Sequence, residues 1–444
     1  MPKTAPTQEK RYLEAFEAFR GAGAARDPMW ARHLRRKAID SFRDLGFPIA
    51  RRGNEEWKYT DVGPIARAPF QTPVTPARVE AGDLEPFTLG RPDWSRLVFV
   101  YGSYAEGLSS VSTQPHGVRV LDIAEAMATS PDLVEQHMAR YADYGPNAFI
   151  ALNTAFLHHG AFLHIPRGTL MEEPVHLLFL STSQEEAVSY PRVMVLCGDE
   201  SRATIIESYC GLSGGRYFTN AVTEMVVGAG ARVDYYRLQR QSEDAFHVTN
   251  TQVTLGRDSN LLSVNIDLGG GVTRNNLNVL MGDEGGSCVL NGLYLVNGSQ
   301  HVDNQVIVDH AMPYTTSREL YKGVLDGRSR SVFHGSIIVR EGARKVDAHQ
   351  LDKNLLLSDQ AEADTKPTFW IYCDDVKCGH GAACGQIDET ALFYLRSRGI
   401  GERAARGMLT RAFVSEVVES IGNEQVRSQV DALVQDRLQE WLGE

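Results

Sequence analysis

The chain has 444 residues, of which 43% are hydrophobic and 23% are charged, as in ordinary globular proteins with two or three domains. Its 45 basic and 56 acidic side chains give a net charge of −11, which argues against a nucleic-acid-binding surface as the main function. The six cysteines show no disulfide-framework spacing, the first segment has no apolar signal-peptide core, and no apolar run reaches about 18 residues. These features predict a cytoplasmic protein with no membrane insertion.

Helical patterns occupy roughly the first 60 residues. The apolar positions between Tyr12 and Phe19 indicate one short amphipathic helix. A second helix is predicted from Asp27, an N-cap followed by proline, to Leu45, with Gly46 as its stop signal. A Pro-rich connection follows within residues 66–92 and predicts few contacts between this module and the rest of the chain. We therefore expect residues 1–90 to form an N-terminal helical module with its linker.

From about residue 95, short β-branched and aromatic runs alternate with glycine turns, which is typical of many short strands. A weak repeat recurs at Gly198, Gly228, Gly256, Gly282 and Gly327, with spacings of 30, 28, 26 and 45 residues. Stacked coils with one long insertion explain these spacings better than a propeller or a sandwich, whose signatures are missing. The predicted fold class is mainly β, with a solenoid core at residues 91–385.

The remaining residues, 386–444, return to helical patterns. Apolar side chains recur at helical spacing from Ala405 to Ile421 and again from Val426 to Leu442. Such stripes either pack on each other and on the β region, or form a surface that binds a partner. Both uses are compatible with a C-terminal helical domain.

Nothing in the chain predicts nucleotide hydrolysis, because it contains no Gly-Lys dipeptide and the Gly-Ala-Gly at 228–230 fits a turn between strands. A rival site consists of His301, Asp303, Asp309 and His310. On a β-helix, Asp303 and Asp309 could be the paired carboxylates of a carbohydrate-active enzyme. Such residues also hold turns and subunit contacts by hydrogen bonding, which is the favoured interpretation.

The most informative segment is 374–385, where Cys378, His380 and Cys384 lie within seven residues. A strand would point Cys378 and His380 in the same direction, because strand side chains alternate. A thiolate and an imidazole together suit Fe(II) or an iron–sulfur site, although buried structural roles compete and the paired spacing of structural zinc is missing. Two ligands do not close a site, so the others would come from elsewhere in the chain or from another subunit.

Five segments together resemble a known family; they are residues 54–60, 352–358, 365–367, 374–385 and 386–400. In these segments the chain resembles the SufB/SufD family of the SUF iron–sulfur cluster assembly machine. The Glu-Glu-Trp-Lys-Tyr-Thr run at 55–60 and Gly381 after His380 make it more similar to SufD than to SufB. The segments lie near both termini and in between, so the resemblance covers the whole chain.

The resemblance implies a right-handed parallel β-helix flanked by helical ends, and a non-catalytic scaffold subunit. It further implies pairing with SufB, docking of the SufC ATPase by the C-terminal helical domain, and iron or a nascent iron–sulfur cluster held where SufB meets this chain. Carried over by position, His380 is the first candidate ligand and Cys378 the second. The family is also associated with reduced flavin, which no residue here places, and a homodimer in place of the mixed complex stays open.

The chain departs from the family pattern at three positions. Gly379 replaces a serine, Cys373 replaces a small residue, and Cys384 replaces a valine. The two extra thiols either add ligands or fill core, of which core filling is favoured.

Overall fold

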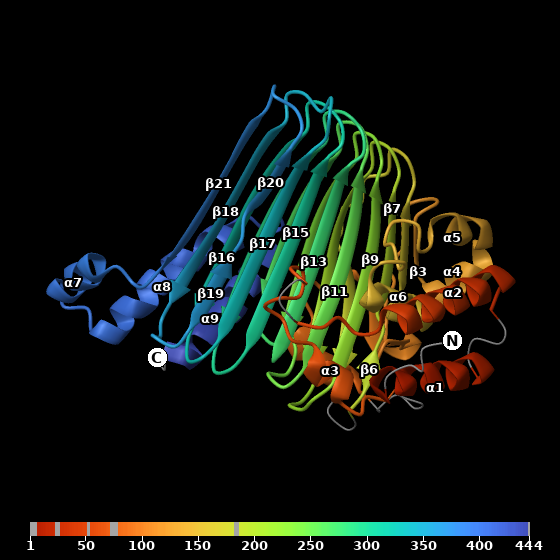
Figure 1. The fold of residues 1–444 in the computed structure, drawn as a ribbon, viewed down its shortest axis with the longest axis horizontal. Helices are drawn as coiled ribbons and strands as arrows, with labels where there is room; N and C mark the ends of the chain where they lie inside the picture. The colour runs from red at the N-terminus through yellow and green to blue at the C-terminus, as the bar shows by residue number, and fades with distance from the viewer. Residues whose placement is uncertain (1–6, 23–26, 51–53, 72–78, 182–185, 443–444) are drawn as a thin grey trace.

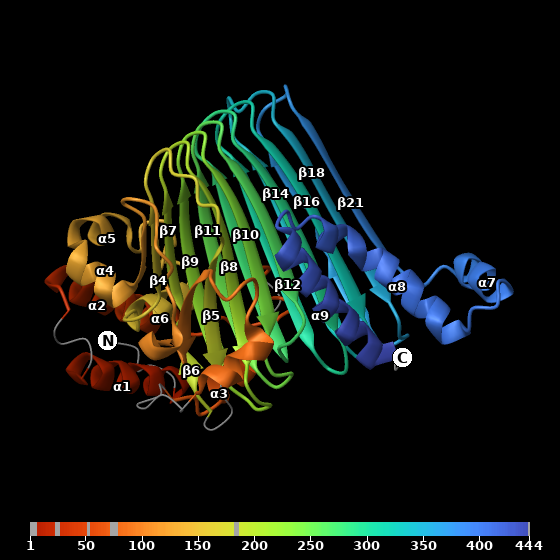
Figure 2. The same cartoon turned by 180° about the vertical axis from the view of Figure 1, so that it is seen from behind.

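The computed structural model describes residues 7–22, 27–50, 54–71, 79–181 and 186–442. Two long and mostly parallel β-sheets lie face to face, with helices against the outer face of each sheet (Figures 1 and 2). We name them the β10 sheet and the β11 sheet after a central strand of each. The described chain is therefore mainly β, a parallel solenoid flanked by N-terminal and C-terminal helices, which confirms the predicted fold class; its right-handed sense stays a prediction.

In spatial order the β10 sheet contains β2 (Ser103–Tyr104), β1 (Ser95–Val100), β5 (Val175–Ser181), β8 (Arg202–Gly211), β10 (Arg232–Arg240), β12 (Asn260–Asp267), β14 (Ser287–Val296), β16 (Thr316–Leu325), β18 (Asp347–Leu356) and β21 (Lys377–Gly385). The β11 sheet contains β19 (Glu362–Thr365), β17 (Arg330–Val339), β15 (His301–His310), β13 (Val272–Met281), β11 (Phe246–Leu255), β9 (Phe218–Val227), β7 (Arg192–Cys197), β4 (Ala161–Ile165) and β3 (Arg119–Asp122). Beside β17 and β9 lie β20 (Thr368–Ile371) and β6 (Val188–Ser189).

From β7 to β18, successive strands alternate between the two sheets, so each pair of strands makes one coil of 26 to 31 residues. Glycine occupies the corner after β9 because the coils stack closely there: a Cβ at Gly228 would lie 2.7 Å from the backbone nitrogen of Asp199. The expected long insertion before Gly327 is wrong. Gly327 follows β16 in the β10 sheet, whereas the earlier glycines follow strands of the β11 sheet.

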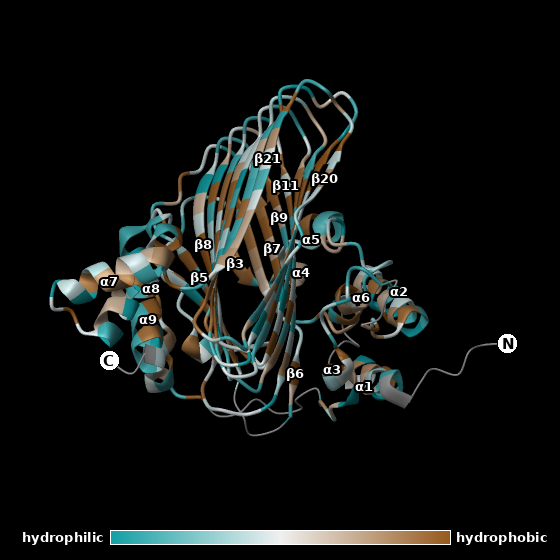
Figure 3. Ribbon diagram, turned by 60° about the vertical axis from the view of Figure 1, so that its left-hand side comes forward, coloured by the Kyte–Doolittle hydropathy of each residue, from teal (hydrophilic) through white to brown (hydrophobic). Residues whose placement is uncertain are grey.

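Hydrophobic (brown) and hydrophilic (teal) segments both occur along the strands (Figure 3), and the space between the sheets holds an apolar cluster together with the buried ion pair of Arg237 and Asp267. Side chains from alternate positions of the strands meet there, including Val233 and Tyr235 of β10 and Val253 and Leu255 of β11. Both faces of β7, β8 and β9 are largely buried, which explains why these strands have long apolar runs in the sequence.

The helices, including the short 3-10 helices η2 and η3, are α1 (Thr7–Ala22), α2 (Met29–Leu45), α3 (Gly63–Arg67), η2 (Ala81–Phe87), η3 (Glu106–Leu108), α4 (Ile123–Thr129), α5 (Pro131–His137), α6 (Ala148–Ala155), α7 (Glu389–Ser397), α8 (Glu402–Glu419) and α9 (Glu424–Leu442). Pro28 rather than Asp27 is the N-cap of α2, and Gly46 ends that helix with a φ of 65° as predicted. Among the described helices, none combines the length and hydrophobicity that crossing a membrane requires.

The N-terminal helices pack firmly on the β11 sheet, so the expectation of few contacts is wrong. Phe42 of α2 and Phe149 of α6 belong to one buried cluster with Phe218 of β9. Further along, the guanidinium of Arg274 lies 3.9 Å from the ring centroid of Trp57 and donates a hydrogen bond to the carbonyl of Glu56. The aromatic side chains of the module find their apolar partners on the outer face of this sheet, which the sequence pattern of a Pro-rich connection does not reveal.

The C-terminal helices cover the outer face of the β10 sheet (Figure 2). Val417 of α8 and Val430 of α9 are buried against Tyr236 of β10 and Leu293 of β14. Trp441 is partly buried at the end of the same cluster. Packing on the β region, one of the two predicted uses of these stripes, is therefore confirmed for α9 and for the second half of α8.

A carboxyl group inside the solenoid makes its stability depend on pH. Glu319 of β16 is buried and neither carboxyl oxygen has a hydrogen-bond partner among the described residues. Desolvation raises its pKa to about 8. This folded-state pKa lies above the unfolded value. The contribution of Glu319 to the free energy of unfolding is therefore highest at acid pH, where the side chain is protonated in both states, and it falls as pH rises toward about 8.

We expect Glu319→Met to be more stable than wild type at pH 8.5, with the difference shrinking by up to about 1.4 kcal/mol per pH unit on going down to pH 5. Methionine has a similar length and needs no hydrogen bond. Urea unfolding of both proteins across this pH range measures the difference. A difference that does not change with pH would show that Glu319 is not the titrating group.

Candidate functional site

The last strand of the β10 sheet carries the candidate metal ligands. In the described part of the chain β21 pairs with β18 alone, which leaves its other edge free. The register places Cys378 beside Ala348 and His380 beside Gln350. Ala348 is buried against Ile337 of the opposite sheet, so the face that these residues share looks into the space between the two sheets.

Cys378 and His380 differ in their surroundings. Cys378 is half-buried and packs on the apolar cluster of Val339 and Val346. This burial raises the pKa of the Cys378 thiol, so the protonated form of this side chain is favoured. His380 is exposed, with its ring centroid 4.6 Å from that of Phe369 in β20. Both side chains therefore lie on the face of β21 that is turned toward Phe369 of β20.

Within the described ranges, no group of three or more histidine, cysteine or acidic side chains is placed to hold a metal ion. Cys373 is half-buried in the same apolar cluster as Cys378, in line with core filling. Cys384 is exposed, so core filling is wrong for that thiol. Cys378 and His380 thus form no closed site with other described residues.

The last coil of the solenoid also exposes apolar side chains. Trp370, Ile371 and Tyr372 lie at the end of β20, and 54% of Trp370 and 62% of Tyr372 are exposed. An unpaired strand edge is a template for another chain, and aromatic side chains are enriched in protein interfaces. We call β20, β21 and the connection between them the open end (Figure 1).

Comparison with known families adds to this geometry. Residues 179–413 match the SufBD core domain of SUF-system iron–sulfur cluster assembly, and residues 6–177 match the N-terminal region of SufBD proteins. The chain belongs to the SufB/SufD family. It is 30% identical to the iron–sulfur cluster assembly protein SufD of Escherichia coli over 98% of both chains, and 25% identical to SufD of Bacillus subtilis over 97% of this chain and 98% of that one. A SufBD family protein of Synechocystis is 31% identical over 87% of this chain and 86% of its own. The matches along the whole length of two SufD proteins confirm the resemblance to SufD.

In this SufB/SufD chain, both carboxylates of the rival enzyme site are paired with arginines. Asp303 is buried and accepts hydrogen bonds from Arg274 at 2.6 Å and from Gln305 at 2.7 Å. Asp309 accepts from two nitrogens of Arg340, at 2.9 and 2.5 Å. Glycoside cleavage needs one carboxyl group to give up a proton and a second to act as base or nucleophile. A carboxylate that accepts hydrogen bonds from an arginine is a poor proton donor, and both candidates are held in this way, so the geometry favours the structural interpretation.

The two histidines of that cluster lie on opposite faces of β15. His301 is 2.9 Å from the hydroxyl of Thr60, on the side of the N-terminal helices. His310 lies inside the solenoid, within 2.7 Å of Thr315 and 3.0 Å of Ser317. Burial lowers the pKa of His310 to about 4, which keeps the ring neutral. The four residues of the SufB/SufD chain that looked like one cluster in sequence are therefore not one site.

A second exposed apolar surface lies on the C-terminal helices of the SufB/SufD chain. Phe393 and Tyr394 of α7 are 72% and 57% exposed, and Met408 of α8 is also exposed. Leu392 of α7 instead packs on Leu355 of the solenoid and holds the helix in place. We call the residues Phe393, Tyr394 and Met408 the α7 surface; it is distinct from the buried stripe of α9.

Proposed function

We propose that this chain is a non-catalytic scaffold subunit of a cytoplasmic SUF complex, which pairs with SufB and docks the SufC ATPase. Iron or a nascent cluster would be held where the chain meets SufB, with His380 and Cys378 as its ligands from this side. The observation that carries the proposal is the open end, where an unpaired strand edge, exposed aromatic side chains and two candidate metal ligands occur together.

Pairing with SufB is supported by the chemistry of the open end. β21 offers a free edge nine residues long, which another β-solenoid could extend. Trp370 and Tyr372 would supply the buried aromatic contacts of such an interface. Relatives of this chain are named as iron–sulfur cluster assembly proteins of the SufBD family.

Shared ligation follows from the number of ligands present. Cys378 and His380 are two donors, one soft and one intermediate, whereas iron in tetrahedral sites takes four ligands. Because the described part of this chain adds no third donor, SufB would supply the others. The iron or cluster is cargo that must leave the complex. Ligands divided between two subunits would allow this release, because separating the subunits removes part of the ligand set.

Docking of SufC is assigned to the α7 surface. Its three apolar side chains are exposed on α7 and α8, and α7 projects past the last strands of the β10 sheet on the side of β21 (Figure 2). An ATPase held there could move relative to the solenoid without breaking the pairing with SufB. Reduced flavin stays possible in the complex, but no described residue indicates where it would bind.

The proposal is tested by expressing the chain together with SufB and SufC and weighing the purified complex by native mass spectrometry. We expect one copy of this chain with one SufB and two copies of SufC, and no ATPase activity in this chain alone. A homodimer of this chain that excludes SufB would contradict the proposal and support the alternative, in which two open ends pair with each other. The same measurement therefore separates the two candidates.

A further inference from the structure

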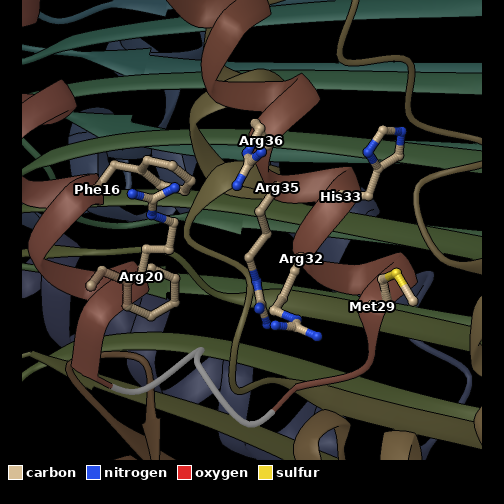
Figure 4. A pocket seen from close by; sticks show the side chains of 8 residues that line it. Phe16, Arg20, Met29, Arg32, His33, Arg35 and Arg36 are labelled. Atoms are coloured by element: carbon tan, nitrogen blue, oxygen red, sulfur yellow. The ribbon is translucent and has the colours of Figure 1, made fainter.

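A basic pocket of about 500 Å³ lies between α1 and α2, far from the open end in sequence (Figure 4). Arg20 of α1 and Arg32, Arg35 and Arg36 of α2 line it, together with His33. The chain as a whole is acidic, with a net charge of −11. The four arginines of this pocket therefore form a positively charged region on an acidic protein. Their charges together create a positive potential in the pocket that attracts anions.

Arg35 is the central residue of this pocket. It is 2% exposed, its Nε donates to the carbonyl of Leu157 at 2.5 Å, and its Nη2 pairs with Asp27. Its third nitrogen, Nη1, is buried and has no hydrogen-bond partner among the described residues. A buried donor without a partner costs free energy, and Arg35 lines the pocket, so a ligand with an acceptor oxygen could satisfy it.

Two neighbours of Arg35 are free to take part. Arg32 and Arg36 are exposed and make no ion pair with any described residue, whereas Arg20 pairs with Glu17 on its own helix. The pocket also lies along the first two turns of α2, where no acidic side chain occupies the first turn and no side chain caps the helix. The partial positive charge of that helix end adds to the arginines.

The remaining wall of the pocket is aromatic. Phe16 and Phe19 of α1 line it, and the guanidinium of Arg35 lies 5.7 Å from the ring centroid of Phe19. Phosphate oxygens suit arginine forks, a flat ring suits the phenylalanines, and a pocket of about 500 Å³ is within the range of small-molecule sites. We propose that this pocket binds an organic phosphate of nucleotide size, with its phosphates on Arg32, Arg35 and Arg36.

The test measures binding of ADP and of inorganic pyrophosphate to the full chain by isothermal titration calorimetry, at an ionic strength of about 0.05 M, where exposed charges are weakly screened. We expect ADP to bind with a dissociation constant below about 0.1 mM, and about tenfold more tightly than pyrophosphate, because the adenine ring adds aromatic contacts. The variant Arg32→Glu/Arg36→Glu should weaken ADP binding at least about tenfold.

The matched control is Lys37→Glu/Arg43→Glu, which makes the same change in net charge on the exposed part of the same helix but outside the pocket. This control should bind ADP as wild type does. No binding of either ligand, or equal loss of binding in both variants, would overturn the proposal. Equal affinity for pyrophosphate and ADP would overturn the proposal that the ligand is an organic phosphate, since Phe16 and Phe19 would then contribute nothing to binding.

Discussion

Replacing Trp370 and Tyr372 by glutamate is expected to separate the chain from SufB while leaving SufC bound. Both side chains are mostly exposed in the chain alone, so the variant should fold normally. In an interface the same positions would bury two carboxylates without partners, and buried aromatic anchors commonly contribute about 2 kcal/mol or more each. Affinity for SufB should fall at least about hundredfold, as measured by surface-immobilised binding assays.

The matched variant is Phe393→Glu/Tyr394→Glu on the α7 surface, which should give the opposite result. It adds the same two charges at exposed aromatic positions, but on α7, which packs on α8. We expect it to lose SufC and keep SufB. If the Trp370/Tyr372 variant kept SufB, or if both variants lost both partners alike, the two surfaces would be wrongly assigned.

His380→Ala is expected to reduce sharply the iron and sulfide retained by the purified complex, while the complex itself stays assembled. His380 is exposed and its described ring contact is with Phe369 alone, so removal of the imidazole costs the fold little. A ligand supplied from this side would nevertheless be lost, and the two-donor half-site would keep only Cys378. Iron and acid-labile sulfide per complex, measured after size-exclusion chromatography, report the effect.

Two cysteine variants are the controls for His380. Cys378→Ser should lower the retained iron and sulfide less, because serine keeps the size and the other ligands persist. Cys384→Val should change nothing, since that exposed thiol lies four residues beyond His380 and outside the proposed pair. Normal iron and sulfide content in the His380 variant, or a loss in the Cys384 variant alone, would show that the ligands are assigned to the wrong residues.

Local signals in the sequence predicted much of the fold. Gly46 ends α2 because glycine readily adopts a positive φ, and the glycine after β9 recurs where coils stack too closely for a side chain. The alternation at Cys378 and His380 was predictable because a strand directs every second residue to the same face. These signals depend on neighbours within a few residues or on one repeat.

Features that depend on contacts between distant segments could not be predicted. Asp303 looked available in the sequence, and its partner Arg274 became visible only when the register set β13 beside β15. The grouping of Arg32 and Arg36 with Arg20 depends on the packing of α1 beside α2, which no local pattern indicates. Trp370 is exposed because the solenoid ends at β21, one strand after β20, and no further coil of the described chain covers it. No local sequence pattern indicates where the solenoid ends.

Amide hydrogen exchange across β21 tests the pairing with SufB most directly. In the chain alone, the N–H groups of residues 377–385 that do not bond to β18 form a free edge and should exchange within seconds. In the complex they should be slowed about hundredfold or more, because the neighbouring chain would accept their hydrogen bonds. Unchanged exchange at residues 377–385 in an assembled complex of this chain, SufB and SufC would contradict the assignment of the open end as the SufB interface.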